Sequence, residues 1–299
     1  EGKGARLDEL RSLARGRATL HETTSVLELS DLMREVVAAG PDLVVLGGGD
    51  GTFMSGVTAL ARHLPEGKWP RIGLLPLGTV GTVARNFGER RPPAELLDAW
   101  LSTPDRVRAI PRPTLRVRAE RNGTVEERVG FIAGTGLVAR FFELYEQGGA
   151  GGVPLAGKIV ARVFVESFAG GPLAKRVLTP IPCELDVDGA RQALGGVSLL
   201  CAAVVRDLGL GMKVCYRAGE EPDRFHLVAS GLSPSRLGPR APYVIMGRTI
   251  GGENHVDDLV RSFRVRFPGG PGPYVLDGDS FQADSFEVSA GPLVPIVGA

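Results

Sequence analysis

Residues 43–52 read Leu43-Val44-Val45-Leu46-Gly47-Gly48-Gly49-Asp50-Gly51-Thr52, and this run sets the architecture expected for the chain. Its first four residues are apolar and predict a buried strand, and the glycines after them predict a phosphate-binding turn. Glycine lets backbone amides approach an anion closely, and the helix expected next directs its positive end to the same place. A bare carboxylate would repel phosphate, so Asp50 is predicted to act through a bound Mg2+ or through a donor on the nucleotide or acceptor.

Two common phosphate-binding motifs do not fit this turn. A Walker loop needs a Lys-Ser/Thr pair after the glycines, and none follows. The dinucleotide fingerprint fails because Thr52 and Met54 stand where its last glycine would be required. No lysine adjoins the turn in sequence. Phosphate charge must therefore be met by backbone amides, arginine or metal.

The first third of the chain alternates helical and strand patterns after a polar, helix-like start. Ser25 and Glu28 form a capping box ahead of a helix that Gly40 ends. The strand, the glycine turn, an amphipathic helix and a second strand over residues 72–75 follow in β-α-β order, and a further helix is expected over residues 94–101. This order predicts a Rossmann-like parallel sheet with helices on both faces, and it brings the glycine turns that follow the two strands side by side.

The pattern changes near Arg106. Apolar and charged residues alternate from Leu115, and Asn122-Gly123 is a strong hairpin signal before the next strand. Further strand-like runs follow, with two helical segments between them. We therefore expect a nucleotide-binding α/β domain over residues 1–108 and a β-rich, β-sandwich-like substrate domain over residues 109–299.

Composition excludes several classes of protein. The chain has 299 residues, 43% of them hydrophobic, and a net charge of +1 with 6% aromatic residues, which argues against a nucleic-acid surface. The longest apolar run is too short to cross a bilayer, so a cytoplasmic location is expected. Three cysteines without C-x-x-C spacing predict buried reduced thiols, and the four histidines form no metal-like cluster.

Two more blocks follow the turn Gly48-Gly49-Asp50-Gly51-Thr52. One runs Leu75-Pro76-Leu77-Gly78-Thr79-Val80-Gly81-Thr82-Val83-Ala84-Arg85-Asn86-Phe87-Gly88, and the other, near the end, is Val275-Leu276-Asp277-Gly278-Asp279. In these motifs and in their order, the chain resembles the diacylglycerol kinase catalytic domain family. That family belongs to one superfamily with sphingosine kinases and NAD kinases.

The resemblance implies a lipid kinase that transfers the γ-phosphoryl group of ATP to the hydroxyl of a diacylglycerol-like or sphingoid lipid at a membrane surface. Gly78 and Thr79 would shape the other side of the nucleotide, and Arg85 would reach a phosphate. Asp277 would take the hydroxyl proton, and Asp50 and Asp279 would organise Mg2+ and complete the catalytic set. Peripheral membrane association is a further expectation, and the sequence leaves a homodimer open.

Simpler roles compete with these. Asp50 could cap a helix from a tight turn, and Arg85 could be a solvated helix residue. Asp277-Gly278 could be an ordinary hairpin turn, as Asp188-Gly189 is expected to be; Asp279 and the family position favour the catalytic role.

The chain also departs from the family pattern. Gly81 stands where the family usually has asparagine, Thr82 replaces a frequent aspartate, and the usual first strand is not evident. These departures favour, as the alternative, a homologue that binds nucleotide or lipid without turnover. An NAD kinase ranks lower, because the Asn-Glu pair that such enzymes use is not evident.

Overall fold

The computed structural model describes residues 3–65, 67–78, 81–148 and 152–298. The chain forms two compact units, one of the residues up to Arg112 with those from Leu293 onward, and one of Pro113–Pro292. Each unit has its own sheets and core. We predicted a second domain over residues 109–299, whereas residues 109–112 and those from Leu293 onward belong to the first unit.

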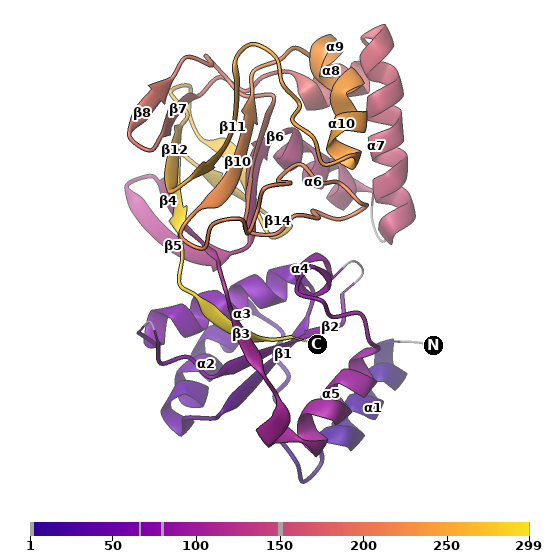
Figure 1. Ribbon diagram of the computed structural model, residues 1–299, viewed down its shortest axis with the longest axis vertical. Helices are drawn as coiled ribbons and strands as arrows, with labels where there is room; N and C mark the ends of the chain where they lie inside the picture. The colour runs from indigo at the N-terminus through magenta and orange to yellow at the C-terminus, as the bar shows by residue number, and fades with distance from the viewer. Residues whose placement is uncertain (1–2, 66, 79–80, 149–151, 299) are drawn as a thin grey trace. The chain divides into compact units, whose positions relative to one another are not determined.

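The first unit is built on a four-stranded sheet in the order β1-β2-β16-β3 (Figure 1). The strands β1 (Leu43–Gly48), β2 (Arg71–Pro76) and β16 (Val294–Val297) are parallel, and β3 (Ala109–Arg112) runs antiparallel to β16. The predicted sheet is therefore confirmed, with one antiparallel edge strand that the sequence analysis did not anticipate.

Helices cover both faces of this sheet. On one face, Trp100 of α5 packs so closely on β2 that a Cβ at Gly73 would lie 2.8 Å from its ring. On the other face α3 approaches β1 just as closely, because a Cβ at Gly56 would lie 2.7 Å from Leu46. The helical segments of this unit are α1 (Lys3–Ala14), α2 (Val26–Ala39), α3 (Asp50–His63), α4 (Thr82–Asn86), α5 (Pro93–Ser102) and the short 3-10 helix η1 (Pro104–Arg106).

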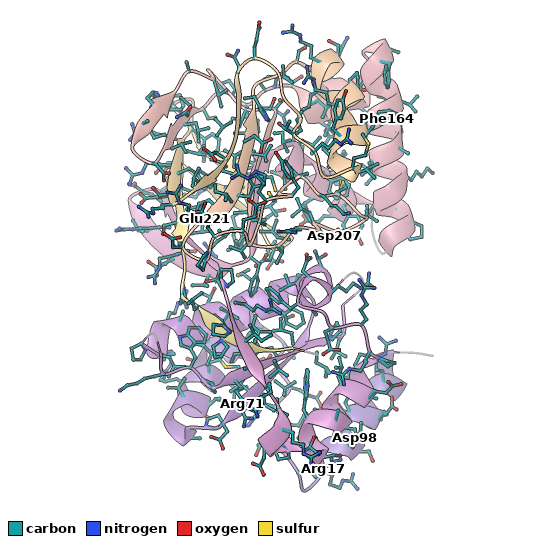
Figure 2. All side chains as sticks on the ribbon, viewed as in Figure 1. Arg17, Arg71, Asp98, Phe164, Asp207 and Glu221 are labelled. Atoms are coloured by element: carbon teal, nitrogen blue, oxygen red, sulfur yellow. The ribbon has the colours of Figure 1, made fainter. Side chains whose placement is uncertain are left out.

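Local signals fix the ends of these elements. The Ser25 hydroxyl accepts the Glu28 amide at the start of α2, and Gly40 ends that helix in the left-handed conformation, as predicted. After α1, Arg17 donates to Asp98 and to the Ser102 hydroxyl, which ties the chain to α5 (Figure 2). Arg71 at the start of β2 donates to the carbonyls of Pro104 and Val107.

The second unit contains two six-stranded antiparallel sheets, in the orders β11-β10-β9-β6-β13-β14 and β5-β4-β15-β12-β7-β8. Aromatic side chains join the sheets: Phe225 meets Phe263 with ring centroids 6.0 Å apart, and Tyr274 stacks on Phe286 at 5.0 Å. The predicted β-sandwich is confirmed. Its strands are β4 (Leu115–Arg121), β5 (Thr124–Gly130), β6 (Ile132–Gly136), β7 (Glu184–Val187), β8 (Ala190–Gln192), β9 (Leu199–Ala203), β10 (Phe225–Ser230), β11 (His255–Val260), β12 (Ser262–Arg266), β13 (Gly272–Leu276), β14 (Asp279–Ala283) and β15 (Ser285–Ala290).

Helices gather at one side of this sandwich in Figure 1. They are α6 (Leu137–Gln147), α7 (Gly152–Ala169), α8 (Pro172–Leu178), α9 (Pro234–Leu237), the 3-10 helix η2 (Gly238–Arg240) and α10 (Ala241–Ile245). No helix among the described residues combines the length and the apolar character needed to cross a bilayer. The three cysteines are buried and free, as predicted.

Candidate functional site

Two glycine turns meet backbone to backbone in the first unit. The Gly48 carbonyl accepts the amides of Leu77 and Gly78, at 2.9 and 3.1 Å. A Cβ at Gly78 would lie 2.7 Å from the Gly49 Cα, so only glycine permits this approach. A Cβ at Gly48 would lie 2.4 Å from the hydroxyl of Thr52. The prediction that the two turns lie side by side is confirmed.

Asp50 links the same two turns through its side chain. It is the first residue of α3, and its two carboxylate oxygens accept the backbone amides of Thr82 and Val83 at 2.9 and 3.0 Å. Burial raises the pKa of Asp50, while those amides and the charge of Arg85 act in the opposite direction. The helix-capping role weighed for Asp50 is therefore present, but the helix that it caps is α4, not its own.

The position of Gly81 explains one departure from the family pattern. Gly81 precedes α4 in the left-handed conformation, with φ of 59° and ψ of 46°. Asparagine is the other residue that adopts this conformation readily, so replacing asparagine by glycine keeps the backbone path. What the substitution removes is a side-chain amide, not the turn.

Arginines line a small cavity next to the second turn. This cavity of about 160 Å3 is bounded by Pro76, Gly78 and Pro93 and by the charged residues Arg85, Glu89, Arg90 and Arg91. Arg91 donates from two nitrogens to the two carboxylate oxygens of Glu89, each at 3.1 Å. Glu89 is only 4% exposed, so this pair fixes the Arg91 guanidinium. The cavity is smaller than a typical pocket for a whole ligand and suits one anionic group.

Asp277 lies at the tip of the β13–β14 hairpin in the second unit. It has φ of 49° and precedes Gly278 at φ 95°, so the hairpin turn weighed as the simpler reading is present. Asp277 is also buried at 6% exposure, and its carboxylate accepts the amides of Phe131 at 3.0 Å and Ile132 at 2.8 Å. A Cβ at Gly130 would lie 2.4 Å from this carboxylate, so Gly130 is needed for the contact.

Asp188 is a close internal comparison for Asp277. It also has a positive φ, of 46°, and precedes a glycine. Its carboxylate accepts the amides of Arg261 and Ser262, at 3.0 and 2.8 Å. Asp188 is exposed, whereas Asp277 is buried. Turn geometry and amide contacts are therefore common to both aspartates, and burial is what distinguishes Asp277.

A second acid lies near Asp279. Asp279 is exposed, but the protein around it removes part of its hydration, and this desolvation and the charge of Glu146 on α6 both raise its pKa, while Arg128 acts in the opposite direction. The hydroxyl of the next residue, Ser280, donates to Glu146 at 3.2 Å. The carboxylates of Asp279 and Glu146 therefore belong to one electrostatic cluster beside the hairpin.

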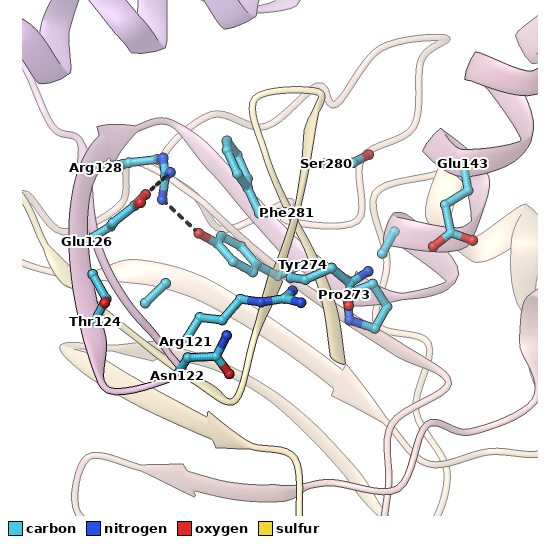
Figure 3. A pocket seen from close by; sticks show the side chains of 13 residues that line it. Arg121, Asn122, Thr124, Glu126, Arg128, Glu143, Pro273, Tyr274, Ser280 and Phe281 are labelled. Atoms are coloured by element: carbon cyan, nitrogen blue, oxygen red, sulfur yellow. Dashed lines mark hydrogen bonds and ion pairs between the residues drawn. The ribbon is translucent and has the colours of Figure 1, made fainter. Parts of the chain in front are cut away.

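A second cavity, larger than the arginine-lined one, lies beside the same hairpin. Its volume is about 640 Å3, and its walls come from β4, β5, β13, β14 and α6 (Figure 3). Arg128 donates to the Tyr274 hydroxyl at 3.1 Å, pairs with Glu126, and lies 4.1 Å from the centre of the Phe281 ring. Pro273, Tyr274 and Phe281 give the cavity apolar walls, and Arg121, Glu126 and Glu143 give it charged ones. This volume is in the range of ligand pockets.

The predicted site residues fall into two groups. Gly48, Gly49, Asp50, Gly51, Thr52, Gly78 and Arg85 lie in the first unit, and Asp277 and Asp279 lie on one hairpin of the second. Thr79 lies outside the described residues. Sequence reasoning missed Glu89, Arg90, Arg91 and Gly130; the run Glu89-Arg90-Arg91 directly after the second motif was the available signal for the first three.

Asp50 has the chemistry to hold one cation. Its two oxygens offer about four lone-pair sites; two accept amides and the Thr82 side chain is a further partner, which leaves capacity for one cation. The described residues contain no group of three or more His, Cys, Asp or Glu side chains arranged to hold a metal. Mg2+ in phosphoryl-transfer sites typically takes one or two carboxylates together with substrate phosphates and waters, so a single carboxylate fits this requirement.

The sequence comparisons agree with the motifs. Residues 3–109 match the family model of the diacylglycerol kinase catalytic domain. A protein of Chromohalobacter salexigens named "Probable lipid kinase YegS-like" is 37% identical over 111 residues, which cover 35% of this chain and 35% of that protein. The aligned part therefore spans about a third of that relative. The resemblance to the diacylglycerol kinase catalytic domain family is confirmed over residues 3–109.

Solved structures extend the likeness of fold to nearly the whole chain. A structure titled as a "putative diacylglycerol kinase" from Bacillus anthracis str. Sterne has a TM-score of 0.67 and covers 99% of this chain and 92% of its own, at 14% identity. A second structure from the same organism, titled as a diacylglycerol kinase, has a TM-score of 0.62 at 13% identity and covers 97% and 88%. At these identities the likeness establishes the fold alone.

Proposed function

We propose that the chain is an ATP-dependent lipid kinase that transfers the γ-phosphoryl group of ATP to a hydroxyl of a diacylglycerol-like or sphingoid lipid. The observation that carries this proposal is the match of residues 3–109 to the diacylglycerol kinase catalytic domain, over the unit in which Asp50 joins the two glycine turns. The name of the Chromohalobacter salexigens relative supports the same class of enzyme.

The first unit would bind the donor. The amides of Asp50, Gly51 and Thr52 belong to the first turn of α3 and have no partner within that helix, so they are available to phosphate oxygens. Arg85 and Arg90 would add positive charge from the 160 Å3 cavity, and the Glu89 pair would hold Arg91 in place. Asp50 would hold Mg2+, which supplies neutralisation of phosphate charge when bound.

The second unit would bind and activate the acceptor. Asp277 would accept the proton of the lipid hydroxyl as its oxygen attacks the γ-phosphorus and ADP leaves. The 640 Å3 cavity, with aromatic walls and a charged rim, suits a molecule with an apolar chain and a polar head. Asp279, together with Glu146, would orient the polar groups of the reaction.

The chain offers a matched control for the role of Asp277. Asp277→Asn and Asp188→Asn make the same chemical change in two Asp-Gly turns whose carboxylates each accept two amides. Purified protein with ATP, Mg2+ and diacylglycerol in mixed micelles should yield phosphatidate. Asp277→Asn should lower kcat at least about 100-fold, the lower end of what general acid–base catalysis contributes, whereas Asp188→Asn should leave it within about twofold.

The two variants separate catalysis from structure. Equal losses in both would show that Asp277 acts only as a turn residue, and full activity of Asp277→Asn would remove its assigned role. A second candidate function is nucleotide or lipid binding without turnover. Two observations favour it: Gly81 lacks the side-chain amide of the asparagine usual in the family, and the carboxylates of Asp50 and Asp277 already accept hydrogen bonds from backbone amides. Nucleotide binding with no phosphorylated lipid would support that candidate, and phosphorylation of NAD+ would indicate an NAD kinase.

A further inference from the structure

Exposed apolar side chains gather on α10 of the second unit and on the residue that caps its end. Tyr243, Ile245 and Met246 are 44%, 62% and 52% exposed. Isolated apolar residues on a protein surface are ordinary, but large ones adjacent to each other on one helical turn usually mark a contact surface. Arg248 and Thr249, which follow the helix in sequence, are also exposed.

A neighbouring loop extends this surface. The Lys213 amide donates to the Val244 carbonyl at 3.1 Å, and a Cβ at Gly247 would lie 3.5 Å from the Lys213 side chain. The loop that carries Lys213 also exposes Leu210. We define the α10 surface as Leu210, Lys213, Tyr243, Ile245, Met246 and Arg248.

The charge of the α10 surface is positive. Lys213 and Arg248 are exposed, and neither forms an ion pair with any residue in the part of the chain that the structure describes. Two acids on adjoining segments have other partners: Asp207 accepts a hydrogen bond from the Gly209 amide at 2.8 Å, and Asp257 accepts hydrogen bonds from the Tyr216 hydroxyl and from a ring nitrogen of His226. Free cations beside exposed apolar side chains fit the anionic headgroups and the acyl boundary of a lipid bilayer.

We infer that the α10 surface docks the protein on anionic lipid membranes, with Ile245 and Met246 entering the acyl boundary and Lys213 and Arg248 contacting the headgroups. This inference rests on the proposed function, because a lipid kinase must reach an acceptor lipid that lies in a membrane. The physical interaction does not require turnover. It is therefore measurable in the absence of ATP and of any acceptor lipid.

The test is sedimentation of the full chain with vesicles that contain no acceptor. Wild-type protein should bind vesicles of phosphatidylglycerol and phosphatidylcholine and should bind pure phosphatidylcholine at least tenfold more weakly. The double variant Ile245→Ser/Met246→Ser should lower the partition coefficient for anionic vesicles at least tenfold. Replacing Lys213 and Arg248 by glutamine should lower it about fivefold per residue, and the loss should match the effect of high salt.

The matched control is Val26→Ser/Leu27→Ser, which removes two adjacent apolar side chains that are 65% and 78% exposed at the start of α2. This control should bind like the wild type, and circular dichroism should show that all variants are folded. Equal binding of wild type and Ile245→Ser/Met246→Ser would overturn the inference. So would wild-type self-association that the double variant abolishes without vesicle binding, because the surface would then serve a second copy of the chain.

The two proposals fail separately. If the protein binds anionic vesicles through the α10 surface but forms no phosphorylated lipid, the docking inference stands and the kinase proposal does not. If it phosphorylates a short-chain, water-soluble diacylglycerol but does not bind vesicles, the kinase proposal stands and the docking inference is overturned. The Ile245→Ser/Met246→Ser variant should keep its activity on that soluble acceptor.

Discussion

Replacing Gly78 by alanine should separate the two glycine turns of the first unit. A Cβ at this position would lie 2.7 Å from the Gly49 Cα and 3.3 Å from the Gly49 nitrogen. Carbon atoms in contact normally lie about 3.5–4.0 Å apart. Because the obstacle is backbone, no side-chain rotation relieves the overlap, and the turns must move apart. Overpacking of this kind costs about 1–3 kcal/mol.

Moving the turns apart also weakens specific bonds. The Gly48 carbonyl would lose one or both of its amide donors, Leu77 and Gly78, and each such bond contributes about 1 kcal/mol. Gly78→Ala should therefore lower the free energy of unfolding of the first unit by about 2–5 kcal/mol.

Gly49→Ala is the matched control, because it changes the other side of the same contact. A Cβ at Gly49 would lie 3.8 Å from the Gly78 Cα, which is an ordinary contact. Gly49 has φ of −92°, so alanine fits its backbone conformation. Alanine at a helix start lowers the free energy of unfolding slightly, and the lower entropy of the unfolded alanine chain offsets this loss. The net change in the free energy of unfolding should be within about 0.5 kcal/mol.

Urea denaturation followed by tryptophan fluorescence measures both variants. The only two tryptophans of the chain, Trp69 and Trp100, lie in the first unit, so the signal reports that unit. If Gly78→Ala is no less stable than Gly49→Ala, the two turns do not approach each other this closely in solution.

Three further predictions concern other contacts. Arg91→Gln should destabilise the first unit by about 2–3 kcal/mol because it leaves the buried Glu89 carboxylate unpaired. Glu89→Gln should cost only about 1 kcal/mol, because Arg91 reaches solvent. Equal losses of the two variants in urea denaturation would contradict this ordering. Gly238→Ala should destabilise the second unit by about 1–3 kcal/mol because a Cβ there would lie 2.0 Å from the Ser167 hydroxyl oxygen, and Ser167→Gly should restore most of that loss; thermal melts that show no rescue would sink the explanation. Burial acts to raise the pKa of Asp257, but hydrogen bonds from His226, His255 and Thr249 outweigh burial and lower it. The contribution of Asp257 to the free energy of unfolding is therefore fully present above the unfolded pKa of about 4. It is lost as the pH falls below that value. Asp257→Asn should therefore cost about 2 kcal/mol at pH 7, and the gap to wild type should narrow in acid; a gap that is constant with pH would refute the linkage.

Much of the fold was predictable from local signals. The capping box at Ser25, the left-handed Gly40 and the hairpin at Asn122-Gly123 act through residues close in sequence, and all are found where expected. The β-α-β order around residues 43–75 is equally local, because hydrophobic period and glycine position determine it. The contribution of β16 to the first sheet was not predictable, because pairing with β2 and β3 joins segments far apart in the chain.

By itself, the sequence determined the glycine turns, the kinase-like motifs and the α/β-then-β division, because these depend on backbone freedom and on periodicity along the chain. Only the tertiary structure decided what the motif residues contact. In the folded chain the Asp50 carboxylate accepts hydrogen bonds from the amides of α4. Asp277 is buried and Asp188 is exposed, although the two aspartates occupy the same kind of turn. Burial and long-range hydrogen bonds depend on which distant segments pack together, and no local pattern encodes them.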